Sequence, residues 1–116
     1  MERVQIRPAK GPEEQLAIDW EIYVQARGWV CMRTHGNLYQ HGFPDYLLLH
    51  HLYGWRWVEL KVLPKHSFTP AQRKCFPIMA AANMGVWVIV GANDCEYRKL
   101  FDGPNWAAYM YANLVR

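Results

Sequence analysis

The chain has few cysteines and no long apolar segment. Its three cysteines, Cys31, Cys75 and Cys95, are widely spaced and form no CxxC pair. This excludes the dense disulfide framework of a small secreted protein and predicts reduced thiols. No apolar run approaches the roughly 18 residues that a membrane-spanning helix needs, and the charged segment from Met1 to Lys10 lacks a signal-peptide core. We therefore expect a soluble, intracellular, cytoplasmic protein with no membrane partner.

The sequence also lacks repeats, low-complexity tracts and a strong charge imbalance. Its 116 residues are 52% hydrophobic, which suffices for one compact domain. We assign residues 1–116 to a single domain, with residues 1–12 as a loose lead-in. The net charge of +3 permits an anionic partner but is far below that of a dedicated charge-neutralising binder. Charge alone therefore does not indicate DNA binding.

Aromatic residues are abundant for so short a chain. Six tryptophans and seven tyrosines supply large apolar areas that suit a core, a protein interface or a base-stacking platform. We assign most of them to the core and to a dimer surface.

The apolar pattern predicts the order helix, three strands, helix, strand, helix. The first helix is expected from Pro12 to about Gly28, with Glu13 on its inward stripe and Glu14 turned away from it. The remaining elements are expected at 29–34, 45–52, 56–63, 70–83, 86–90 and 105–115. Pro77 should kink the second helix or divide it into two short pieces. This order implies a mixed sheet flanked by helices, in the α/β or α+β class.

A predicted strand pair carries the candidate chemistry. Glu59 and Lys61 are two residues apart on the third strand and therefore share one face. The preceding strand begins at Asp45, and the two strands form a hairpin. Asp45 reaches Glu59 only if the register brings the open strand ends together or a bulge bends one of them. The alternatives are a solvated surface ion pair for Glu59 and Lys61 and a turn role for Asp45.

Two converging carboxylates with a nearby backbone carbonyl form a hard oxygen site suited to Mg²⁺, with Mn²⁺ as a substitute. Asp45, Glu59 and the carbonyl of Leu60 are the candidate ligands. A metal there can activate a water and neutralise charge on a phosphodiester. Lys61 can orient the attacking water or stabilise the negatively charged transition state.

Three segments resemble motifs of the virus-type replication-repair nuclease (VRR-NUC) family, a branch of the PD-(D/E)XK nucleases. They match its G-x-P-D, E-x-K and downstream Q motifs and read His41-Gly42-Phe43-Pro44-Asp45, Trp57-Val58-Glu59-Leu60-Lys61 and Phe68-Thr69-Pro70-Ala71-Gln72. The resemblance covers about residues 13–90. The expected element order agrees with the restriction-endonuclease-like αβββαβ core of that superfamily, and residues 92–116 would be a C-terminal addition.

The resemblance implies roles for the matching residues. Asp45 and Glu59 would bind the metal with the carbonyl of Leu60, and Lys61 would be the catalytic lysine. Gln72 would stand at the edge of the site, while a capping-box role after Thr69 is an equal alternative for it.

The family also places a glutamate on the first helix. Glu13 is our choice for this position, with Glu14 as the alternative.

The resemblance further implies a partner and a reaction. Small single-domain members of the family are phage-borne homodimers that cut branched DNA, such as Holliday junctions, and leave a 5′-phosphate. We therefore expect a metal-dependent endonuclease that acts on branched DNA. It would be encoded by a phage and active in the bacterial host cytoplasm. The alternatives are a flap, single-strand or restriction-like nuclease, a non-catalytic DNA-binding module with the nuclease fold, and an interaction protein that uses its aromatic surface.

Two further sets of residues bear on this hypothesis. The histidines at positions 35, 41, 50, 51 and 66 form no spaced ligand set with the cysteines, which argues against zinc. Basic residues near the motif ends would steer a DNA backbone, with an ordinary charged surface as the alternative; they are Arg33, Lys65, Arg73 and Lys74. No pattern reads bases, so specificity would come from DNA shape.

Overall fold

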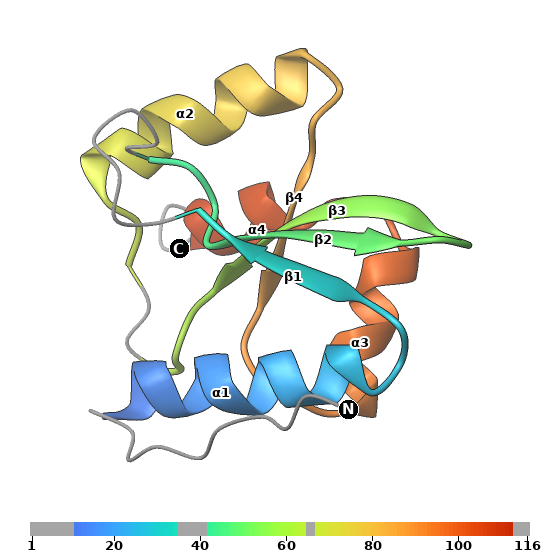
Figure 1. The fold of residues 1–116 in the computed structure, drawn as a ribbon. Coiled ribbons are helices and arrows are strands. Elements are labelled where there is room, and N and C mark those ends of the chain that lie inside the picture. The colour runs from blue at the N-terminus through green and yellow to red at the C-terminus, as the bar shows by residue number, and fades with distance from the viewer. Residues whose placement is uncertain (1–10, 35–41, 65–66, 113–116) are drawn as a thin grey trace.

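The fold is a mixed four-stranded sheet with helices packed on both faces (Figure 1). The computed structural model describes residues 11–34, 42–64 and 67–112. In chain order the elements are α1 (Pro12–Gln25), β1 (Val30–Arg33), β2 (Tyr46–His50), β3 (Gly54–Leu60), α2 (Pro70–Ala81), β4 (Val86–Ile89), α3 (Asp94–Tyr97), η2 (Arg98–Phe101) and α4 (Trp106–Met110). This architecture confirms the predicted fold class. Within the described ranges, no helix is long and apolar enough to cross a membrane.

The two long helices begin where their local sequence predicts. In α1, Pro12 occupies the first turn together with two glutamates that complement the helix dipole. In α2, Thr69 and Gln72 form a capping box. Pro77 lies inside α2, yet residues Pro70–Ala81 form one helix, so the alternative of two short helices is wrong. The proline removes one hydrogen bond, and packing of the helix on the sheet offsets that loss.

The strands lie in the order β1-β2-β3-β4. β1, β2 and β3 pair antiparallel, and β4 runs parallel to β3. The β2–β3 turn is a tight reversal in which Gly54 has a φ of 85°, a conformation that glycine adopts without strain.

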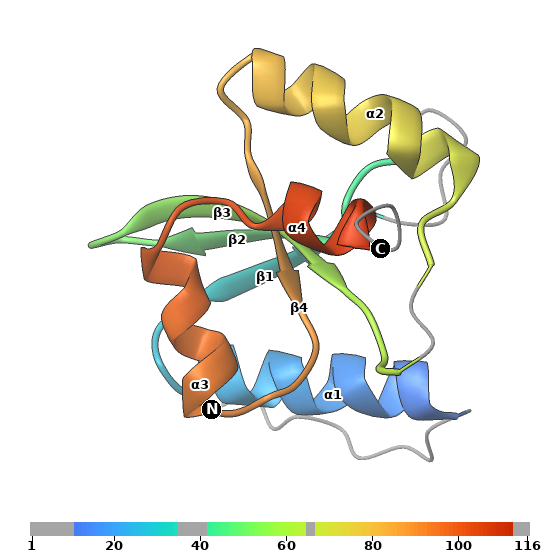
Figure 2. The same cartoon turned by 180° about the vertical axis from the view of Figure 1, so that it is seen from behind.

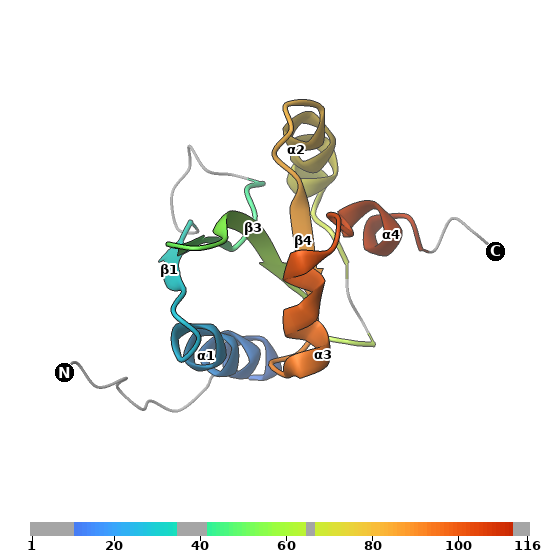
Figure 3. The same ribbon diagram turned by 90° about the vertical axis from the view of Figure 1, so that its right-hand side faces the viewer.

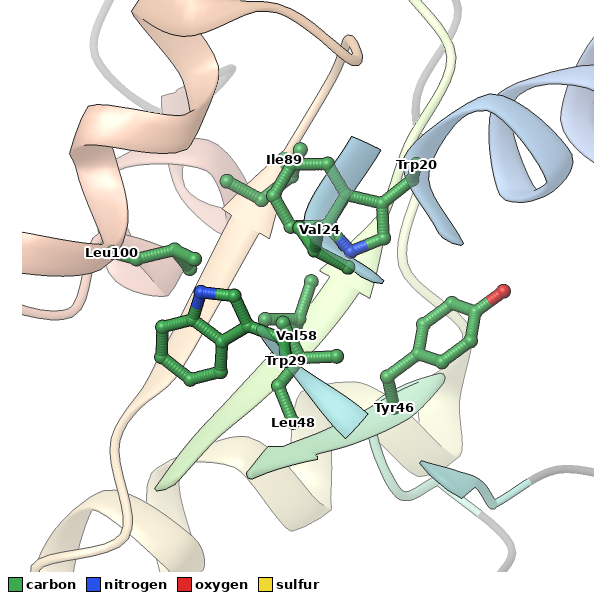
Figure 4. Close-up of a cluster of buried hydrophobic side chains, with 8 residues drawn as sticks. All are labelled: Trp20, Val24, Trp29, Tyr46, Leu48, Val58, Ile89 and Leu100. Atoms are coloured by element: carbon green, nitrogen blue, oxygen red, sulfur yellow. The ribbon is translucent and has the colours of Figure 1, made fainter. Parts of the chain in front are cut away.

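Each face of the sheet carries its own core cluster. Beneath α1 lies a cluster whose buried members are Trp20, Val24, Trp29, Tyr46, Leu48, Val58, Ile89 and Leu100 (Figure 4). On the other face, α2 and α4 cover a second cluster of Phe68, Phe76, Met79, Val86, Val88 and Met110. Figure 3 shows α1 and α2 on opposite sides of the sheet. The alternating apolar residues of β3 and β4 thus serve both faces.

The C-terminal segment differs from expectation. The expected helix over 105–115 is shorter, Trp106–Met110, and residues 113–116 lie outside the described part of the chain. A helical turn at Asp94–Tyr97 and a 3-10 turn at Arg98–Phe101 were not expected. The signal for the first was Asn93, whose side chain caps the turn by accepting from the Glu96 amide at 2.9 Å.

This segment covers the outer edge of β4 (Figure 2). The side-chain oxygen of Asn105 accepts from Val88 N at 2.6 Å, and its amide nitrogen donates to Val88 O at 3.0 Å. The carboxylate of Glu96 accepts from Val90 N at 2.9 Å. Side chains thereby satisfy backbone groups that would otherwise offer an edge for another strand. The C-terminal segment therefore closes the free edge of β4 with side-chain hydrogen bonds.

We expect Asn105→Ala to lower the free energy of unfolding by about 1–3 kcal/mol, because it leaves the buried Val88 N–H and C=O without partners. Urea denaturation followed by tryptophan fluorescence measures the change. Asp102→Ala removes an exposed polar side chain from the same segment and should change stability by less than about 0.5 kcal/mol. Equal losses in the two variants would show that Asn105 does not hold this edge.

Candidate active site

The hairpin register brings Asp45 and Glu59 together. The last β2–β3 pair is Tyr46 with Val58, so the next residues along the strands, Asp45 and Glu59, stand opposite each other at the open end. The Asp45 amide donates to Glu59 Oε1 at 3.1 Å, and the Leu60 amide donates to Asp45 Oδ2 at 2.9 Å. The register that the sequence left open is therefore the one that joins the open strand ends.

The segment before Asp45 is fixed from two sides. Gly42 has a φ of 87°, and a Cβ built on it would lie 2.6 Å from the Ala71 carbonyl oxygen of α2, so only glycine fits. On the other side, the Thr34 amide donates to Asp45 O at 3.0 Å and its hydroxyl donates to Pro44 O. These contacts hold the Asp45 backbone beside Glu59.

Glu59 is a buried carboxylate that accepts three hydrogen bonds. Only 3% of the residue is exposed. Besides the Asp45 amide, Gln72 Nε2 donates to Oε2 at 2.9 Å and Lys61 Nζ lies 3.2 Å from the same oxygen. Burial and the charge of Asp45 raise the pKa of Glu59 to about 7, against the opposing effects of Lys61 and Gln72.

Two hydrogen bonds and a ring contact fix the position of the Lys61 ammonium group. Its Nζ donates to Ser67 O at 2.6 Å and to Gln72 Oε1 at 3.1 Å, and it lies 4.5 Å from the ring centroid of Phe68. The side chains of Lys61 and Glu59 are 11% and 4% exposed. A solvated surface ion pair, one alternative at the level of sequence, is therefore wrong for this pair.

Gln72 has both of the roles that the sequence offered as alternatives. It closes the capping box, since its amide donates to Thr69 Oγ1 and its Oε1 accepts from the Thr69 amide, each at 3.1 Å. The same side chain donates to Glu59 and accepts from Lys61. The first turn of α2 thus fixes the orientation of both charged groups.

An open cavity of about 360 Å³ borders these residues on the α1 side. Its lining includes Glu13, Glu14, Leu16, Ala17, Arg33, Asp45, Tyr46, Glu59, Leu60, Lys61, Val62 and Ser67. Both glutamates of the first turn of α1 thus reach it. Glu14 is half-buried whereas Glu13 is exposed, so the expectation that Glu14 turns away is wrong. Helical spacing aligns Glu13 with the buried Trp20, seven residues later, but it does not fix the exposure of a side chain in the first turn of the helix.

Arg33 forms part of the cavity wall, where Glu21 binds it. Its Nε donates to Glu21 Oε2 at 2.8 Å, and the Tyr46 hydroxyl donates to the same oxygen. Although burial lowers the pKa of Arg33, Glu21 and Glu14 raise it overall. Sequence reasoning missed Glu21. The signal was its spacing of seven residues from Glu14, which places both on one helix face.

Two of the other expected basic residues lie away from the cavity. Arg73 and Lys74 are exposed on α2 and do not line it. Lys65 lies outside the described residues, as do His35, His41 and His66. His50 has a structural role, because its ring nitrogens bond to Arg27 O and Leu52 N at 3.0 Å each.

The donor set fits a hard divalent cation with few protein ligands. Across residues 11–34, 42–64 and 67–112, no group of three or more His, Cys, Asp or Glu side chains could hold a metal. Asp45 and Glu59 nevertheless supply two adjacent carboxylates, and Mg²⁺ commonly uses one or two of these, together with waters and substrate phosphates. The Leu60 amide points at Asp45, and its carbonyl lies on the same strand edge. These three residues could hold Mg²⁺ or Mn²⁺.

Comparison with known proteins gives no match: no family model fits the chain, and no curated protein or solved structure is significantly similar to it. The functional argument therefore depends on the site itself.

We expect the metal-free protein to lose unfolding free energy as pH rises from 4.5 to about 7. The folded pKa of Glu59 is raised, so the folded state retains a proton that the unfolded state releases over this window. Glu59→Gln should flatten this part of the stability–pH curve, whereas Glu13→Gln, at an exposed position, should not. Denaturant titrations across this pH window measure the unfolding free energy. Equal slopes of unfolding free energy against pH in wild type and Glu59→Gln would contradict the expectation.

Proposed function

We propose that the chain is a divalent-metal-dependent DNA endonuclease that hydrolyses phosphodiester bonds. The observation that carries the proposal is the convergence of Asp45, Glu59 and Lys61 at the wall of an open cavity. A buried carboxylate with a raised pKa, next to a second carboxylate and an ammonium group, is typical of sites that do chemistry. The three motifs that resemble VRR-NUC nucleases meet at this one place.

Each residue has a defined task in the proposed reaction. Asp45 and Glu59 would bind the cation, together with the carbonyl of Leu60. Bound Mg²⁺ or Mn²⁺ would supply an acidified water and neutralise charge on the scissile phosphate. Lys61 places a positive charge beside the reacting phosphate and stabilises the transition state. Gln72 keeps the Glu59 carboxylate and the Lys61 ammonium in position through its two hydrogen bonds.

Branched DNA, with the Holliday junction as the favoured form, is the proposed substrate. The support is the motif resemblance together with a sequence that contains no base-reading pattern, so selection by DNA shape is the available route. We propose that the chain acts as a homodimer, because a two-fold junction needs two symmetric cuts. Among the described residues other than Lys61, Arg33 lines the cavity and is the basic residue that we propose contacts the DNA backbone near the reacting phosphate.

The test is cleavage of a labelled four-way junction, with matched linear duplex, flap and single-stranded DNA, in Mg²⁺, Mn²⁺ or EDTA. We expect paired cuts near the branch point that require metal and leave 5′-phosphates. Lys61→Ala should reduce the rate at least about 100-fold, as loss of a transition-state donor does. Arg98→Ala, which removes an exposed cation of η2 outside the cavity, should cut at the wild-type rate.

Other outcomes separate the alternatives. Metal-dependent cutting of flap, single-stranded or linear DNA in preference to junctions would support the proposed nuclease activity and overturn the proposed branched substrate. DNA binding that is equal in Mg²⁺ and EDTA, without cleavage of any substrate, would overturn the enzyme in favour of a non-catalytic DNA-binding module.

A further inference from the structure

One part of the sheet surface is apolar but exposed. Cross-strand partners in an antiparallel sheet project from the same face, and the register joins Val30 to Leu49 to Trp55, and Met32 to Leu47 to Trp57. These two rows of three define what we term the open sheet face. No charged side chain is among the six residues.

The exposure of this face is large. Val30 is 58% exposed, Met32 48%, Trp55 46% and Leu49 37%. The other two residues, Leu47 and Trp57, are half-buried, and Trp57 packs against the second core cluster. Elsewhere on the same side of the sheet, Val86 and Val88 are fully buried in the cluster formed with α2 and α4. Figure 3 shows that α2 stands above β4 and not above β1. Of the part of the chain that the structure describes, the helices therefore cover only the β4 half of this side.

The sequence of these strands does not suit a solvated face. A strand with one solvent-exposed face alternates apolar with polar residues. In β1 and β2, the residues that face α1 are buried or half-buried except Arg33, and they include Cys31 and Leu48. The intervening positions are again apolar. A strand that is apolar on both sides is typical of a sheet covered on both sides.

We propose that a second copy of this chain covers the open sheet face, so that two sheets pack face to face about a two-fold axis. A symmetric contact uses the same patch on both partners and must be self-complementary. An uncharged apolar surface meets this condition. It offers nothing that would neutralise DNA phosphates, and homodimer interfaces are more apolar than other surfaces.

Homodimer contacts have an apolar centre, and large apolar patches on monomers are often functional. Phe43 extends the open sheet face, since it is 38% exposed and its ring centroid lies 5.9 Å from that of Trp57. The open sheet face together with Phe43 thus supplies the apolar centre of the proposed contact.

The contact also fits the proposed function, on which its biological meaning rests. Glu59 pairs with Val88 and follows Trp57 by two residues, so the site residues stand on the same side of the sheet as the open sheet face, at the ends of its strands. The cavity extends from there to Leu16 and Ala17 of α1, and in the proposed dimer each cavity serves one strand of a symmetric substrate.

Sedimentation equilibrium of the full chain over a range of micromolar concentrations tests the proposal. We expect wild type to show twice the 13.7 kDa chain mass. The double variant Val30→Lys with Leu49→Lys should dissociate at least tenfold more readily, because four lysines would meet in the apolar contact. Ile78→Lys adds one lysine at an apolar α2 position that is 62% exposed and should remain dimeric. Circular dichroism verifies that each variant folds.

Hydroxyl-radical labelling of the unmodified chain gives a second readout. Oxidation of Met32 and Trp55 should fall as concentration rises through the dimerisation range, while oxidation of Phe101, exposed on η2, stays constant. A monomer at every concentration, or a dimer with unchanged labelling of Met32 and Trp55, overturns the proposal. A dimer that cuts no DNA supports the pairing and counts against the nuclease, and a monomer that cuts DNA overturns the pairing alone.

Discussion

The arrangement of this protein depends on the burial of one ionisable carboxylate. Glu59 is 3% exposed, and burying a carboxylate is costly unless donors and a counter-charge surround it. The Asp45 amide, Gln72 and Lys61 provide these. Replacing such a buried pair by apolar residues is often neutral or stabilising in proteins, so stability alone gives no reason for it. Its position at an open cavity is the reason to infer chemistry.

The surrounding elements supply what Glu59 requires. The β2–β3 register sets the Asp45 amide opposite it, and the capping turn of α2 delivers Gln72. Gly42 lets the segment that leads to Asp45 approach α2 closely. Each of the three motifs thus contributes a residue to the same cluster. Further along the chain, the C-terminal segment closes the edge of β4 through Asn105 and keeps the sheet on which the site is built intact.

Local patterns predicted much of this arrangement. The two-residue period of a strand placed Glu59 and Lys61 on one face, and the spacing from Thr69 predicted the turn that carries Gln72. Properties set by tertiary contacts were not accessible. The hairpin register, the orientation of Glu14 and the Glu21–Arg33 pair depend on packing between distant segments. The turns at Asp94–Tyr97 and Arg98–Phe101 are too short for periodicity to reveal.

The central claim is that Asp45 and Glu59 together form a divalent-cation site, and Mn²⁺ binding followed by electron paramagnetic resonance measures this directly, without DNA or cleavage. The account predicts one bound Mn²⁺ in the wild type, lost in Asp45→Asn and in Glu59→Gln. Glu21→Gln removes a nearby carboxylate that binds Arg33 and should leave the Mn²⁺ bound. Wild type that binds no Mn²⁺, or Mn²⁺ binding that survives in both Asp45→Asn and Glu59→Gln, would contradict the account.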